Sequence, residues 1–119
     1  LSMVRAGFYK MEDHLKGDTF DGVTFNLTNK TNGVPIDLTG CVIRAQFRKG
    51  VNKGALIKDV TTSEGVTIMD AANGVFSIDS FLLNWDAAIY NYDVQFTFSN
   101  GVVKTYIKGT IKITQDSTY

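Results

Sequence analysis

Few residues of this chain have side chains that could carry out chemistry. The single histidine, His14, follows two acidic residues in a polar segment near the N-terminus, and no nucleophile stands beside it. A general base needs an oriented partner and a nucleophile within reach, so we interpret His14 as a solvated surface residue. The single cysteine, Cys41, lies on the apolar side of an alternating stretch, where a thiol behaves as a small hydrophobe. We expect Cys41 to be buried, reduced and unreactive.

Metal, phosphate and nucleotide sites are not indicated either. One cysteine and one distant histidine do not form a zinc-ligand pattern, and no spacing of carboxylates is typical of a calcium loop. No glycine-rich loop of the phosphate-binding or dinucleotide-binding type is present. The sequence therefore predicts a protein that is not an enzyme and that has no catalytic residue, metal or cofactor. The aspartates at predicted turns are Asp18, Asp21, Asp37, Asp70, Asp79 and Asp86.

Short strands are the elements that must position these residues. Turn signals that contain glycine recur about every ten residues, and Asn-Gly or Asp-Gly pairs favour the positive φ angles of tight hairpins. Regular spacing of this kind predicts many short antiparallel strands. The turn glycines are Gly22, Gly33, Gly40, Gly50, Gly65, Gly74 and Gly101.

Between the turns, apolar and polar residues alternate with a period of two, which is typical of strands with one buried and one solvated face. The alternating stretches are 23–27, 41–48, 66–68, 76–78, 90–99 and 103–114. Residues 80–86 carry clustered apolar residues without alternation. We interpret them as a short helical turn with Ser80 as its cap.

Residues 86–92 show the pattern of the tyrosine corner of immunoglobulin domains, an aspartate, small residues and a tyrosine before an alternating strand. We expect Tyr90 to be buried, with its hydroxyl bonded to backbone in the corner that begins at Asp86. Antibody domains place a disulfide cysteine two residues later, where this chain has Tyr92, so aromatic packing is expected to replace the covalent tie. The predicted fold is an all-β immunoglobulin-like β-sandwich of two antiparallel sheets with about seven to eight strands.

The chain of 119 residues fits one domain, and its acidic and basic residues balance. Balanced charge creates no field that would attract nucleic acid or an anionic membrane, and no window approaches the roughly 20 apolar residues of a membrane helix. We predict a single domain over residues 1–119, with residues 1–2 as an expression scar. Residues 3–15 are expected to contact a neighbouring subunit or partner, or to pair along an edge, rather than to join the central core.

Two groups of basic residues face solvent in the predicted strands and loops. The first is Arg44, Arg48, Lys49 and Lys53, and the second is Lys104, Lys108 and Lys112 with Tyr106 between them. Since the net charge is zero, we interpret them as solubilising residues that block random edge pairing rather than as a nucleic-acid site. The last strand is expected to offer its backbone to one chosen protein partner. The predicted interaction surface consists of Phe8, Tyr9, Lys104, Tyr106, Lys108 and Lys112.

An ordered set of motifs resembles a known class of proteins. The motifs are GDT at 17–19, GVPIDLTG at 33–40, EGVTI at 64–68, NGVFSI at 73–78, YNYDV at 90–94, NG at 100–101 and KGTIKI at 108–113. Their order is similar to that in small phage and prophage proteins of the tail or baseplate type, and to the N-terminal immunoglobulin-like domain of baseplate upper proteins. The resemblance implies a structural module that holds virion parts together or presents a host-binding element.

The leading hypothesis is a non-catalytic phage structural protein, a tail or baseplate accessory or assembly module that acts through protein–protein contacts. Its expected partners are other tail or baseplate proteins and further copies of itself. Its expected location is the cytoplasm of the bacterial host during assembly and then the virion. The alternative is a module that binds host-surface carbohydrate on a flat aromatic platform. The candidates for that platform are Tyr9, Trp85, Tyr106 and Tyr119.

Overall fold

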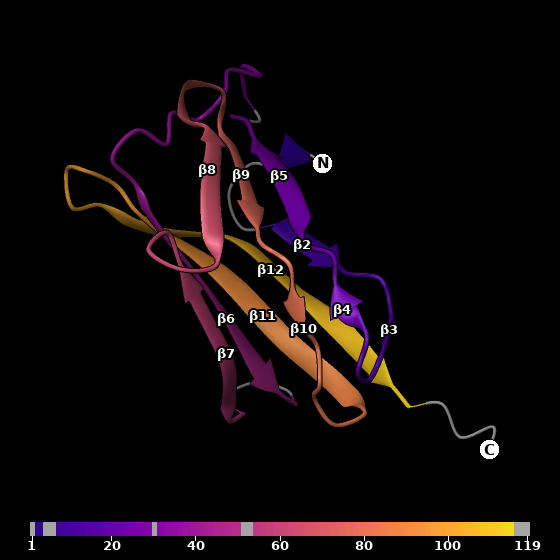
Figure 1. The fold of residues 1–119 in the computed structure, drawn as a ribbon. Helices are drawn as coiled ribbons and strands as arrows, with labels where there is room; N and C mark the ends of the chain where they lie inside the picture. Colours follow the sequence, from indigo (N-terminus) through magenta and orange to yellow (C-terminus); the bar gives the residue numbers. More distant parts are fainter. Residues whose placement is uncertain (1, 4–6, 30, 51–53, 116–119) are drawn as a thin grey trace.

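The computed structural model describes residues 2–3, 7–29, 31–50 and 54–115, and the side chains from residue 9 onward. Within these ranges the chain forms twelve strands and one 3-10 turn, η1 (Ala71–Asn73) (Figure 1). The strands are β1 (Ser2–Met3), β2 (Gly7–Lys10), β3 (His14–Leu15), β4 (Thr19–Phe20), β5 (Val23–Leu27), β6 (Val42–Lys49), β7 (Leu56–Thr61), β8 (Val66–Asp70), β9 (Val75–Ile78), β10 (Phe81–Leu82), β11 (Ala88–Thr97) and β12 (Val103–Thr114).

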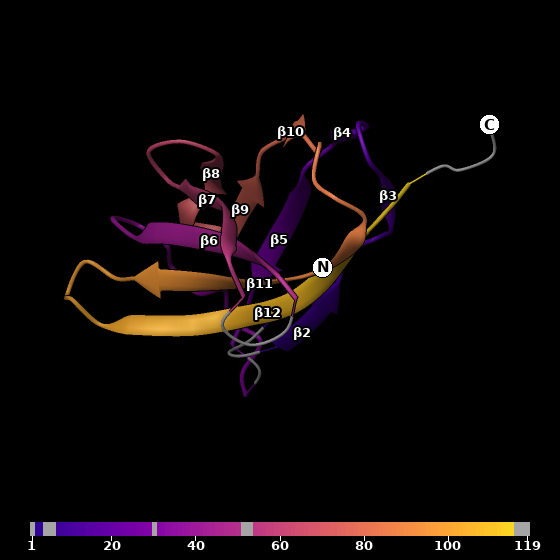
Figure 2. The ribbon, with the colours of Figure 1, turned by 90° about the horizontal axis from the view of Figure 1, so that it is seen from below.

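The strands form the two layers of an immunoglobulin-like β-sandwich, as the sequence predicts. One layer is a six-stranded sheet in the order β2-β12-β11-β6-β7, with β3 also paired to β12. The other layer combines the four-stranded sheet β1-β5-β9-β8 with the two-stranded sheet β10-β4. Figure 2 shows β11 and β12 in one layer and β8, β9 and β10 in the other. The number of strands exceeds the expected seven to eight because β1, β3, β4 and β10 are only two residues long.

The predicted turns and alternation are confirmed. Each predicted turn glycine has a positive φ, between 69° and 99°. The strongest spatial constraint is at Gly74, where a Cβ atom would lie 2.4 Å from the Leu27 carbonyl oxygen. Alternate residues of β6 and β11 are buried, including Phe47 and Phe96. These buried faces pack together because each sheet has one apolar side to remove from water.

An aromatic cluster connects the two layers. Phe25 of β5 and Phe76 of β9 stack with ring centroids 5.3 Å apart, and Phe76 meets Phe96 of β11 edge to face at 5.3 Å. All three side chains are fully buried. Each such aromatic pair contributes about 0.5–1.5 kcal/mol beyond the burial of its surface. The chain therefore holds its layers together with rings rather than with a disulfide.

The helical turn predicted at residues 80–86 is wrong. Phe81 and Leu82 form β10, which pairs with Phe20 and Thr19 of β4. Phe81 packs inward and Leu83 is fully buried, whereas Leu82 between them is 64% exposed. The segment is thus an alternating strand whose outward residue happens to be apolar, and this hides the period-two pattern in the sequence.

The N-terminal segment joins the sandwich, which contradicts the expectation that it stays outside the core. Strands β2 and β3 pair in parallel with β12, and the Met11 amide donates to the Thr110 carbonyl over 2.9 Å. Met11 is only 3% exposed and belongs to the core. Ser2, interpreted above as part of a scar, lies in β1, which pairs in parallel with β5. The antiparallel arrangement therefore holds for the central strands and not for these N-terminal ones.

Candidate functional site

The tyrosine corner is present as predicted. Tyr90 is 1% exposed, and its hydroxyl donates to the Asp86 carbonyl oxygen over 2.7 Å. The Asp86 carboxylate is exposed and lies 3.2 Å from the Lys16 ammonium and 3.5 Å from that of Lys49. The hydrogen bond from Lys16 is the main cause that lowers the pKa of the Asp86 carboxyl. The corner is thus fixed by a buried hydroxyl and flanked by solvated ion pairs.

Tyr92 takes the place of the cystine and has a second role that the sequence analysis missed. Its ring lies 5.5 Å from that of Phe47, and its hydroxyl donates to the Tyr9 carbonyl oxygen over 2.7 Å. Gly109 faces Tyr92 on β12, and a Cβ atom there would lie 1.8 Å from the Tyr9 oxygen. The glycine therefore leaves room for Tyr92 to reach across β12 and hold β2. A glycine inside an alternating strand was the available signal, because it often marks a close approach of another backbone.

Cys41 is 5% exposed, as predicted, and burial raises the pKa of its thiol. His14 differs from the prediction because it is half-buried rather than solvated. Its ring lies 5.4 Å from the Phe20 ring, and its Nδ1 is 2.9 Å from the Glu12 carbonyl oxygen. His14 thus covers the end of β4.

The predicted interaction surface does not come together. A β-bulge opposite Val94 and Gln95 shifts the register of β12, so Lys104 faces the buried Phe96. Tyr106 packs on the same side, with its ring 5.3 Å from that of Phe96. Lys108 pairs with Asp93 and lies with Lys112 on the outer face, and both lysines are exposed. The Tyr9 ring packs edge to face on Phe25 at 5.7 Å, and the side chain of Phe8 lies outside the described part.

The edge of β12 is also not open to a partner where it was expected to be. Residues 107–110 pair with β2, and Ile113 and Thr114 pair with β3 of the same chain. Backbone donors and acceptors at a strand edge need partners, and here the N-terminal segment supplies them. The prediction that this edge receives another protein is therefore wrong for these residues.

Basic residues of the first group are engaged within the chain. The Arg44 guanidinium binds the Asp59 carboxylate through two contacts, and it holds the pKa of that carboxyl below its ordinary value. Arg48 donates to the Gly54 carbonyl over 3.3 Å, and Lys49 pairs with Asp86. Lys53 lies outside the described residues.

The aromatic candidates for a carbohydrate platform are spread along the six-stranded sheet. Trp85 contacts Tyr90 at the start of β11, with ring centroids 5.0 Å apart. Tyr9 accepts its hydrogen bond from Tyr92, and Tyr106 packs on Phe96 near the other end of the strand. Tyr119 is outside the described residues. Within the described part these rings therefore form no common flat surface.

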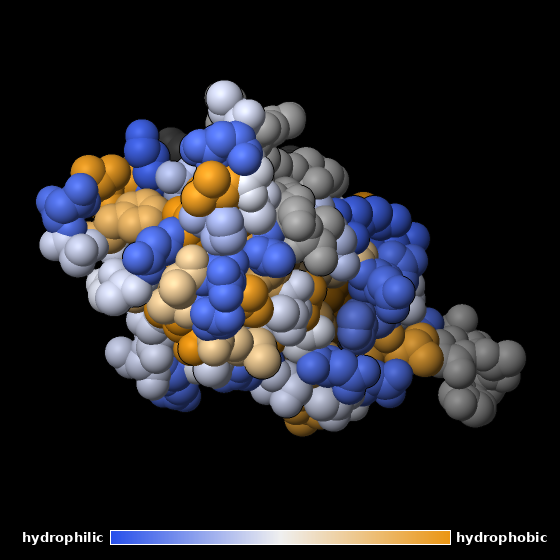
Figure 3. Space-filling model, turned by 90° about the horizontal axis from the view of Figure 1, so that it is seen from above, coloured by the Kyte–Doolittle hydropathy of each residue, from blue (hydrophilic) through white to orange (hydrophobic). Residues whose placement is uncertain are grey.

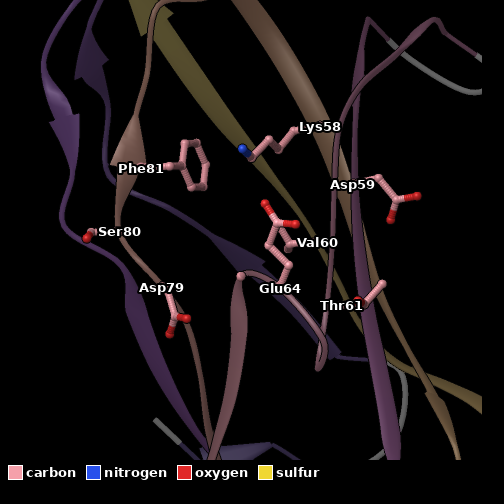
Figure 4. A pocket seen from close by; sticks show the side chains of 9 residues that line it. Lys58, Asp59, Val60, Thr61, Glu64, Asp79, Ser80 and Phe81 are labelled. Atoms are coloured by element: carbon pink, nitrogen blue, oxygen red, sulfur yellow. The ribbon is translucent and has the colours of Figure 1, made fainter.

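A cleft separates β7 from the connection between β9 and β10. Its volume is about 490 Å³. Figure 4 shows Lys58 opposite Phe81, with Glu64 rising from the β7–β8 turn and Asp79 at the end of β9. The Lys58 ammonium lies 4.8 Å from the centre of the Phe81 ring. The complete lining is Lys58, Asp59, Val60, Thr61, Glu64, Gly65, Asp79, Ser80 and Phe81.

Hydrogen bonds determine which charges the cleft presents. The Asp79 carboxylate accepts from the Thr67 hydroxyl over 2.9 Å and from the Ser77 hydroxyl over 3.2 Å. Asp59 points to the other side of β7, where it binds Arg44. The cleft therefore presents the carboxylates of Glu64 and Asp79 and the ammonium of Lys58.

A second candidate surface is an apolar patch at the far end of the sandwich, which we call the tip patch. Val42 and Val103 are each 51% exposed, and Val102 is 42% exposed. Thr97 of β11 pairs with both Val42 and Val103, so the two valines lie in one cross-strand row. Figure 3 shows apolar side chains near the end of the molecule formed by the β11–β12 turn.

Among the described residues, no group of three or more His, Cys, Asp or Glu side chains could hold a metal ion. No helix in that part of the chain has the length and apolar character needed to cross a membrane.

No protein-family model and no curated protein matches this chain. A solved structure of extracellular domains 3–5 of Drosophila OTK is similar over 96% of this chain and 33% of that one, with 15% sequence identity and a TM-score of 0.31. The chain thus spans about a third of the length of that structure. The immunoglobulin-like assignment stands on the strand order and the tyrosine corner described above.

Proposed function

We propose that this chain is a non-catalytic structural module of a phage tail or baseplate and that it acts through contacts with other virion proteins. The ordered motifs at 33–40, 73–78 and 90–94 support the phage assignment through their resemblance to tail and baseplate proteins. In this proposal the protein assembles in the cytoplasm of the bacterial host and becomes part of the virion.

The tip patch is the observation that carries a role in protein contacts. Three exposed valines from β6, the β11–β12 turn and β12 gather at one end of an otherwise mostly polar surface. Contiguous exposed apolar side chains mark surfaces that bind other proteins, whereas single ones are common everywhere. Valine has a stiff side chain and loses little conformational entropy when a partner covers it. The tip patch therefore suits a stable contact between structural proteins.

Purified virions and tail proteins test the proposal. We expect mass spectrometry to find the chain in particles and affinity capture to bind it to a tail or baseplate protein of the same phage. The double substitution Val42→Lys and Val103→Lys should weaken that binding at least about tenfold without changing the melting temperature. Val34→Lys is the matched control, since Val34 is 54% exposed but lies in the β5–β6 connection. Absence from particles together with no binding to any tail protein would overturn the proposal.

A further inference from the structure

The short strand β10 has one edge paired with β4 and one edge that faces the cleft. Directly after β10, the Leu83 amide donates to the Asp18 carbonyl over 3.0 Å, and the Leu83 carbonyl accepts from the Gly17 amide over 2.9 Å. Backbone groups of successive strand residues point to opposite sides, so the N–H and C=O of Leu82 point away from β4. In the described ranges no strand pairs with β10 on that side.

The corresponding position in the upper half of the same layer is filled by β8. Strand β8 pairs with β9, and the last bond of that pair joins the Asp79 amide to the Gly65 carbonyl over 2.8 Å. From Gly65 the chain connects to β7 in the other layer, so no described strand continues β8 alongside β10 (Figure 1). The cleft occupies this position, and its volume falls within the range of about 300–1,000 Å³ that is usual for ligand sites.

The side chains of the cleft favour a particular chemistry. Val60 and Phe81 supply apolar contacts, and the Lys58 ammonium covers the Phe81 ring. The carboxylates of Glu64 and Asp79 lie at the other end, near the point where β8 begins (Figure 4). Two carboxylates against one ammonium give the cleft a net negative charge, which attracts a cationic side chain.

We propose that an extended segment of a partner protein, with one lysine or arginine between small apolar residues, pairs with the open edge of β10 and lies in this cleft as a third strand of the β4–β10 sheet. Backbone bonds to Leu82 supply binding that any extended chain can make, and the cation beside Glu64 and Asp79 sets the register. The inference rests on the proposed role in protein contacts and names a contact separate from the tip patch.

An amide NMR titration of the full chain tests this inference. The probe is a capped heptapeptide, Thr-Val-Thr-Lys-Thr-Val-Thr, and the matched control peptide has glutamate in place of the central lysine. We expect chemical-shift changes at Lys58, Glu64, Ser80 and Leu82 with the lysine peptide, and hydrogen exchange of the Leu82 amide should slow at least about tenfold. No shifts at millimolar peptide, or shifts confined to another surface, would overturn the inference.

Two substitutions separate backbone pairing from unspecific binding. Leu82→Pro removes the N–H that faces the cleft and leaves the bonds to β4 in place, whereas Leu82→Ala keeps the N–H. Affinity for the lysine peptide should fall at least about tenfold in the proline variant and stay within about twofold in the alanine variant. Equal affinity in both variants, with melting temperatures unchanged, would sink the strand-addition idea.

A charge exchange provides a test that does not depend on the proline variant folding. Glu64→Lys should weaken the lysine peptide and strengthen the glutamate peptide, and unchanged preferences would contradict the assigned register. The outcomes also separate the two proposals. If virion proteins still bind the tip patch while neither peptide binds the cleft, only the inference about the cleft falls.

Discussion

The hydroxyl of Tyr90 is a buried donor whose acceptor, the Asp86 carbonyl, belongs to the corner itself. Tyr90→Phe should lower the free energy of unfolding by roughly 1–3 kcal/mol, because the carbonyl loses its partner in a site that water reaches poorly. Urea denaturation followed by fluorescence measures this loss. Tyr106→Phe is the control, since the Tyr106 hydroxyl makes no hydrogen bond within the described part of the chain. Equal losses in the two variants would contradict the importance of the corner bond.

Buried tyrosines also make stability depend on alkaline pH. Burial raises the pKa of the Tyr90 phenol and, far more, that of Tyr92. A folded-state pKa above the unfolded value favours folding fully below the ordinary tyrosine pKa of about 10. That contribution is lost as the pH rises above this value toward the folded-state pKa. We therefore expect the free energy of unfolding to fall above about pH 10, and to fall less steeply in Tyr92→Phe.

Denaturation curves at several alkaline pH values, combined with tyrosinate absorbance, check this expectation. The absorbance change from Tyr92 should appear only as the protein unfolds. If the native protein forms that tyrosinate near the ordinary pKa without unfolding, the buried position of Tyr92 is contradicted.

At the scale of elements, the contact between β2 and β12 depends on one missing side chain. Gly109→Ala would place a Cβ atom 1.8 Å from the Tyr9 carbonyl oxygen and 2.7 Å from the Tyr92 hydroxyl. The backbone of β2 would have to move, so we expect a loss of about 1–3 kcal/mol and faster hydrogen exchange at the Met11 amide, which bonds to Thr110.

Thr110→Ala is the matched control for the glycine substitution. Thr110 pairs with Asn91 in the outer-face row, so its substitution should change stability by no more than about 0.5 kcal/mol. Native-state hydrogen exchange of both variants decides the matter. A Gly109→Ala protein with unchanged protection at Met11 would contradict the tie between Tyr92 and β2.

At the scale of the whole molecule, the N-terminal segment completes the sandwich. Removal of residues 1–15 deletes β2 and β3 from the edge of β12, Met11 from the core and the carbonyl that Tyr92 bonds. Loss of a buried methionine alone costs about 2–5 kcal/mol, so the truncated chain should be at least that much less stable. Its uncovered β12 edge should also increase self-association. Urea denaturation and light scattering on both chains test this, and a truncated chain as stable and as monodisperse as the full one would contradict it.

Local features of the sequence were sufficient to predict the fold class and most strands. Glycine turns, period-two alternation and the corner pattern each act within about ten residues, so they are readable without knowing which segments meet. On this basis the corner at Tyr90, the buried Cys41 and the strands from residue 41 onward are confirmed. Burial of Tyr92 follows from the same alternation, although its bond to Tyr9 does not.

Only the tertiary structure decided the features that depend on distant partners. The parallel pairing of β2 with β12 joins segments about a hundred residues apart, and its sequence carries no period that would announce it. The bulge in β12 moved Lys104 and Tyr106 to the inner face, because one extra residue reverses every side chain beyond it. The cleft beside β10 likewise exists because the chain at Gly65 connects to the other layer, which no local pattern records. Composition and alternation thus determined that this chain is a β-sandwich, whereas hydrogen-bond pairing between distant strands determined which surfaces it presents.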